Sequence, residues 1–152
     1  MKNEILKDKI FEVIKQQELL TEQKTGTKDF IEMVSLLFHS RTQAHVFHLG
    51  VSGAGAYAAH VALQGYYEEI VGLTDGLVES YQGKNGLITF KPVMGLDNNC
   101  DTRNIIAYFD KICMIVKTLR QAPDLADSFL QNQIDNVEDL IYSTKYKLVN
   151  LQ

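Results

Sequence analysis

The stretch from Ala56 to Tyr81 constrains the fold of this chain more than any other. It contains no proline, and its apolar residues recur at intervals of three and four. This spacing is typical of an α-helix with one apolar face, because it places those side chains above one another. The residues that define the face are Ala59, Leu63, Tyr66, Tyr67, Ile70, Leu73, Leu77 and Val78.

Comparable apolar spacing predicts two helices before this stretch. The first covers residues 3–20, and the second runs from Thr27 or Asp29 to about residue 49. A polar linker around Gly26 is expected to separate them. Asp29 followed by Glu32 fits a capping box at the start of the second helix.

The pattern breaks again after the central helix. Residues 83–101 hold three glycines and one proline, and so long a connection usually carries a function or a short element of its own. We expect a loop or a short helix there. A further helix is predicted from Asp101 or Thr102 to Arg120, and a last one over residues 124–149, after Pro123.

Together these elements predict an all-α protein. A tight turn between the first pair of long helices and a long connection between the second and third favour a ferritin-like four-helix bundle. We expect residues 1–26 to form a helical arm and linker, and residues 27–152 to form the bundle.

Composition limits the environment and the partners. The formal net charge of −4 argues against a surface made for nucleic acid, although lysines near the N-terminus leave DNA as a weakly supported partner. No apolar run approaches the ~18–20 residues that span a bilayer, so no membrane partner is expected. Cys100 and Cys113 form no CxxC pair, which favours free thiols and a cytoplasmic location.

Four residues carry the candidate chemistry: His48, His60, Asp75 and Glu79, which are twelve, fifteen and four positions apart. On one helix His60 and Asp75 lie roughly 22 Å apart, so one ion cannot bind both within a chain. A two-fold partner running antiparallel would bring its two carboxylates against these histidines and form the site twice. Imidazole with carboxylate suits iron, with zinc or manganese as alternatives.

This spacing resembles the ferroxidase motif of the Dps family, the miniferritins or DNA-binding proteins from starved cells. The likeness is motif-specific over residues 41–81 and covers the helix order over residues 28–150. It implies a homo-oligomeric shell of twelve subunits that oxidises iron(II) with peroxide or oxygen, stores the product and protects against oxidative stress. It also implies that His48 and His60 are ligands from one subunit and Asp75 and Glu79 from the other, with Glu79 as the bridging ligand or the primary anchor.

The sequence departs from the family pattern at three positions. Gln64 stands where a second acidic residue is usual, and Leu49 stands where a tryptophan commonly follows the first histidine. His45 competes with His48 as the first ligand, so the full set of metal candidates includes His45 and Gln64. The alternative function is a non-catalytic shell protein, structural or DNA-associated, with a degenerate metal site; a different helical-bundle protein, such as a regulator, also stays open.

Overall fold

A computed structural model describes the backbone of residues 2–151 and the side chains of residues 9–18 and 27–151. Regular structure in this part of the chain is entirely helical, which confirms the predicted all-α class. The elements are α1 (Lys2–Gly50), α2 (Ala56–Asn85), α3 (Thr102–Leu119), the short 3-10 helix η1 (Pro123–Leu125) and α4 (Ser128–Asn150).

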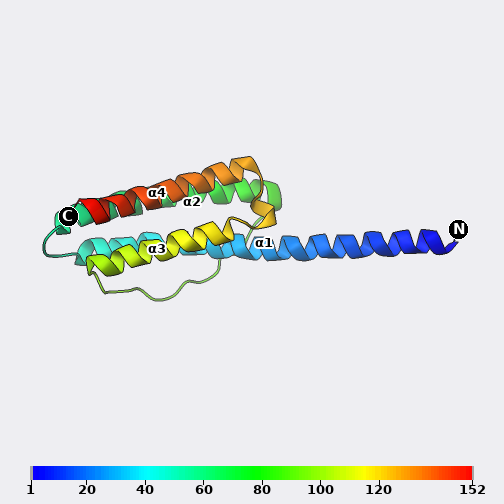
Figure 1. Ribbon diagram of the computed structural model, residues 1–152, viewed down its shortest axis with the longest axis horizontal. Helices are drawn as coiled ribbons and strands as arrows, with labels where there is room; N and C mark the ends of the chain where they lie inside the picture. The colour runs from blue at the N-terminus through cyan, green and yellow to red at the C-terminus, as the bar shows by residue number, and fades with distance from the viewer. Residues whose placement is uncertain (1, 152) are drawn as a thin grey trace.

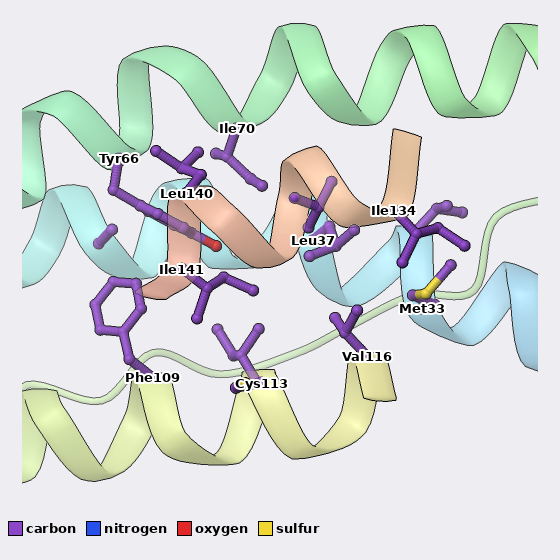
Figure 2. Close-up of a cluster of buried hydrophobic side chains, with 14 of the residues drawn as sticks. Met33, Leu37, Tyr66, Ile70, Phe109, Cys113, Val116, Ile134, Leu140 and Ile141 are labelled. Carbon is purple, nitrogen blue, oxygen red and sulfur yellow. The ribbon is translucent and has the colours of Figure 1, made fainter. Parts of the chain in front are cut away.

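The four α-helices pack around one core. α1 lies against α2 and α3, and α4 lies against the same two helices from the other side (Figure 1). Figure 2 shows side chains from all four helices pointing into the space between them. Burying one large apolar side chain completely stabilises the folded state by about 1.5–3 kcal/mol. The fully buried members include Met33, Leu37, Tyr66, Ile70, Phe109, Ile134 and Ile141.

The prediction of two N-terminal helices separated by a linker is wrong. α1 runs without interruption through Gly26, and Asp29 lies inside the helix and does not cap it. One glycine costs a helix only about 1 kcal/mol relative to alanine, and the polar residues around it are compatible with a helix in water. The N-terminal part of α1 extends beyond the bundle (Figure 1), and residues 9–18 are all exposed.

The remaining helix boundaries agree with the sequence except at α4. Asp101 caps α3 as predicted, because its carboxylate accepts a hydrogen bond of 2.9 Å from the N–H of Arg103. After Pro123 the chain first forms η1, and α4 begins only at Ser128. Asp127 adopts an extended conformation between them, so the predicted start at residue 124 is wrong.

The predicted long loop is present and is bonded to α1 along its course. We call residues 87–100 the strap; it has no helix or strand and runs from the end of α2 to the start of α3 (Figure 1). Ser35 Oγ accepts from the N–H of Lys91 at 3.0 Å, and His39 Nε2 donates to the carbonyl of Gly95 at 2.7 Å. These α1 residues lie four positions apart, so one helix face positions the strap.

Gln43 lies one turn further along the same face of α1, and its side chain makes two hydrogen bonds to the strap. Its Nε2 donates to the carbonyl of Asp97 and its Oε1 accepts from the N–H of Asp97, both at 2.7 Å. The side chain is 1% exposed. The Gln43 amide therefore bonds both the N–H and the carbonyl of Asp97, as a neighbouring strand would in a β-sheet.

We expect Gln43→Ala to lower the free energy of unfolding by about 1–3 kcal/mol, because it leaves both backbone groups of Asp97 without their partner. Urea denaturation measures the change. Gln121→Ala is the matched control, since Gln121 is exposed and its side chain has no hydrogen bond within the described residues. Equal losses in the two variants would show that Gln43 does not hold the strap.

Candidate metal centre

A short glycine turn brings the two candidate histidine ligands together. α1 ends at Gly50 and α2 begins at Ala56. Gly53 and Gly55 between them adopt φ values of 88° and 74°, in the left-handed region that favours glycine. The reversal therefore places His48, in the last turn of α1, beside His60 in the second turn of α2.

The two histidines bind each other's backbone. His48 Nδ1 donates to the carbonyl of His60 at 2.9 Å, and His60 Nδ1 donates to the carbonyl of His48 at 3.0 Å. The rings stack with centroids 3.5 Å apart. We call this pair the histidine clasp. A carbonyl oxygen only accepts, so each Nδ1 carries a hydrogen, and in the neutral rings each Nε2 has a free lone pair.

Two aromatic side chains lie beside the clasp, and one cation lies over one of them. His45 stacks on Tyr67 with centroids 4.3 Å apart and lies edge-on to His48 at 5.7 Å. The guanidinium of Arg41 lies 5.8 Å from the Tyr67 ring centroid. Tyr67 and Arg41 were not predicted from the sequence as parts of this region. Tyr67 lies seven positions after His60, a spacing that places both on one side of α2 and could have identified it.

The two candidate carboxylates lie away from the clasp on the same helix. Asp75 and Glu79 are exposed on α2, and neither has a hydrogen bond or ion pair within the described side chains. Fifteen residues of helix, roughly 22 Å, separate Asp75 from His60. Between them Gln64 Nε2 donates to Glu68 Oε1 at 2.8 Å on the exposed surface. Within one chain the nitrogen and oxygen ligands are therefore not brought together.

The clasp alone does not form a metal site. Among residues 9–18 and 27–151, no three side chains of His, Cys, Asp or Glu gather closely enough to hold an ion. The ring planes are only 24° apart, so the two Nε2 lone pairs, which lie in those planes, do not converge on one ion. The two Nε2 atoms of the clasp are therefore separate candidate donors.

These features define an all-α protein with its two candidate histidines at one end of α2 and its two candidate carboxylates toward the other end. The chain belongs to DUF5856, a family of unknown function, which it matches over residues 53–148. The matched region contains His60, Asp75 and Glu79, and His48 lies before it. No curated protein and no solved structure matches the chain significantly. None of the described helices combines the length and apolarity needed to cross a bilayer.

Gly50, next to the clasp, gives a test of how closely the strap approaches α1. A Cβ at this position would overlap Cys100 Sγ. We expect Gly50→Ala to lower the free energy of unfolding by about 1–3 kcal/mol through overpacking, as measured by urea denaturation.

Two further variants isolate the contact with Cys100. Gly83→Ala is the control, since a Cβ there meets nothing within 4 Å. Adding Cys100→Ala to Gly50→Ala removes the sulfur and should restore part of the loss. A Gly50→Ala protein as stable as the parent would contradict the close approach of strap and helix.

Proposed function

We propose that two copies of this chain jointly bind and oxidise iron(II), at sites where the histidine clasp of one copy meets Asp75 and Glu79 of the other. The observation that carries the proposal is that the candidate nitrogen and oxygen ligands have no bonding partners within the described part of their own chain. Neither Nε2 atom of the clasp has a hydrogen-bond partner within the described side chains, with His48 7% exposed, and both carboxylates are exposed and unpaired. Each half lacks what the other half supplies.

The surface of α2 is suited to such a pairing. Antiparallel α2 helices that join position 60 to position 75 of the other copy cross midway, between residues 67 and 68. Gly65 and Gly72 flank this midpoint, and a Cβ at either would meet nothing within 4 Å on its own chain. Small residues permit close approach of two helix backbones, so the carboxylates of one copy can reach the histidines of the other.

The donor set fits the chemistry. Imidazole nitrogen and carboxylate oxygen are ligands that iron accepts, and zinc or manganese could occupy the same donors. Bonding each Nδ1 to a backbone carbonyl fixes the orientation of a ligating imidazole. In this proposal each histidine binds one ion, and Glu79 of the other copy bridges the two ions. Two ferrous ions then give one electron each to a peroxide, which takes up two protons and leaves as two waters.

The helix arrangement supports the larger assembly in this proposal. A short turn joins α1 to α2, and a long connection joins α2 to α3. Each helix runs antiparallel to the helices that it packs against. Ferritin-like bundles have this order of helices and connections. We extend the proposal to a closed cytoplasmic shell of twelve such chains, which stores iron and limits damage by peroxide. The predicted division at residue 26 would leave the N-terminal arm outside this bundle.

A second candidate is a shell protein without catalysis. It is favoured by Gln64, a neutral residue that is hydrogen-bonded to Glu68 at a position where an acidic ligand would strengthen the site. Association with DNA gains no support from charge. Residues 1–26 hold five lysines and five acidic residues, so the arm has no net basic character.

Iron oxidation by single variants tests the proposal. We expect His60→Ala and Glu79→Ala each to lower the initial rate of peroxide-driven ferric formation by about tenfold or more, because each removes a ligand from every site. Stopped-flow absorbance measures the rate on metal-free protein mixed with iron(II). Glu69→Ala is the control, because Glu69 is exposed on the same helix. Parent rates in both ligand variants would refute the ferroxidase.

Mixing the two variants tests whether the site lies between copies. In randomly re-associated pairs half contain one chain of each kind, and each such pair has one intact site of two, so activity should return to about a quarter of the parent. A site built within one chain would give no recovery. Native mass spectrometry of the same samples counts the chains, each of 17.2 kDa; a single-chain mass would also exclude the shared site.

A further inference from the structure

The part of α1 that projects from the bundle carries apolar side chains that the bundle does not cover. Residues 9–18 lie beyond the bundle, and every one of their side chains is exposed (Figure 1). Most helical stability in proteins comes from packing an apolar face, so these side chains contribute little unless another surface covers them. Four of them are large and apolar, with Ile10 51%, Phe11 68%, Val13 54% and Ile14 48% exposed.

An apolar groove lies on the bundle where α1 meets the end of α3. It has a volume of about 270 Å³, and Met114 on its wall is 63% exposed. The Glu32 carboxylate pairs with Lys91 Nζ at 3.3 Å, so no described residue that lines the groove carries an unmatched charge. The groove therefore suits an apolar side chain. It is lined by Glu32 from α1 and by Met114, Ile115, Thr118 and Leu119 from α3.

The exposed apolar residues of a chain do not reach the groove of the same chain. α1 is one continuous helix, and Ile14 lies eighteen residues before Glu32, which is five full turns or roughly 27 Å along the axis. Five whole turns also place the two residues on the same side of α1. A second copy of α1 that runs antiparallel along this side therefore brings its Ile14 to the groove, while its own groove receives Ile14 of the first copy.

The charges beside these residues match in the same arrangement. Glu18 lies one turn after Ile14, and Lys28 lies one turn before Glu32. Both are exposed, and neither has an ion-pair partner within the described side chains. Because the two helices run in opposite directions, the register that aligns residue 14 with residue 32 also aligns residue 18 with residue 28. A carboxylate then faces an ammonium group twice in each pair.

We propose that two copies of this chain pair through antiparallel α1 helices, with Ile14 of each copy in the groove of the other. Glu18 of each copy binds Lys28 of the other. The two-fold axis passes near residue 23, so one operation fills both grooves. A specific interface buries at least about 1,000 Å² in total. One groove is too small for this, but two grooves and the α1 contact between them extend the interface over roughly 27 Å. The contact does not involve α2, which stays available for the pairing at the proposed iron site.

Chemical cross-linking between separately prepared full-length chains tests the pairing. One chain carries Ile14→Cys, and the other carries Thr118→Cys on the wall of the groove. Both carry Cys100→Ala, which removes the partly exposed natural thiol, while Cys113 is buried. After mixing and treatment with a short bismaleimide, we expect a product that joins residue 14 to residue 118, identified by mass spectrometry of the digested protein. Each chain has only one of the two new thiols, so this product forms only between copies.

Glu12→Cys, used in place of Ile14→Cys, is the matched control. Residue 12 is exposed in the same part of α1. Two residues turn a helix by about 200°, so residue 12 faces away from the groove in the proposed pair and its yield should be at least about tenfold lower. Absence of the 14–118 product from the mixture overturns the proposal, as do equal yields from residues 12 and 14.

Charge reversal tests the register of the two helices. The protein concentration that gives half of the maximal 14–118 product measures the affinity. Glu18→Lys and Lys28→Glu should each raise this concentration about tenfold, because each places like charges side by side twice in a symmetric pair. The two changes together restore opposite charges and should return it to within about threefold of the parent. Glu12→Lys, on the other side of the helix, should leave it unchanged. Parent affinity in both single variants, or no recovery in the double variant, overturns the proposed pairing.

These outcomes are independent of the proposed iron site. All the altered residues except Cys100 are exposed, so the variants should keep the helix content of the parent, which circular dichroism verifies. None of them belongs to the histidine clasp or to the candidate carboxylates, and iron is absent throughout. A protein that oxidises iron at the parent rate but gives no 14–118 product would overturn the α1 pairing alone.

Discussion

The rest of the structure depends on how α1 is joined to α2, and the histidine clasp fixes that junction. The last four carbonyls of a helix lack partners within it. His48 belongs to this last turn of α1, and its carbonyl accepts from His60 Nδ1 on the next helix. The bond in return, from His48 Nδ1 to the His60 carbonyl, sets the register of the two helices. One pair of side chains thus closes a helix end and aligns the largest helix pair of the bundle.

α1 then serves as the reference for every later segment. Ser35, His39 and Gln43 on one face hold the strap, which has no regular structure to position it. Where α1 leaves the bundle, the Tyr81 hydroxyl bonds to Asp124 and lies 3.1 Å from Thr27 Oγ1. Burial, with the Asp124 carboxylate, raises the pKa of Tyr81 to about 12, so this hydroxyl remains a donor. Side-chain hydrogen bonds therefore fix α1 near both ends of its buried part.

Periodicity predicted the helices that bury a clear apolar stripe, and it failed where polarity was taken as evidence for a loop. α2 and α3 were identified because their apolar residues face the core at every turn. The segment around Gly26 is polar, yet α1 continues through it, because polar residues and a single glycine are compatible with a helix. Polarity alone therefore says little about backbone conformation.

The candidate site was predicted to a similar extent. The spacing of His48 and His60 across a glycine turn indicated that they meet, and they do. The mutual hydrogen bonds and the stacking of Tyr67 on His45 could not be predicted, because they depend on the exact approach of two helices. The strap contacts join residues more than fifty positions apart, such as His39 and Gly95, for which no local pattern exists.

The candidate histidines lie at the junction of α1 and α2, and the candidate carboxylates lie toward the other end of α2. This separation has a thermodynamic consequence for the proposed iron site. A metal ion that binds only where two chains meet stabilises their association by its binding free energy. By linkage, the same coupling makes association raise the affinity for metal by an equal factor. A lone chain, with a stacked histidine pair and two unpaired carboxylates, would bind iron weakly. It would therefore catalyse little oxidation of iron by peroxide. Oxidation would then be confined to the assembled particle, where the ferric product can be enclosed.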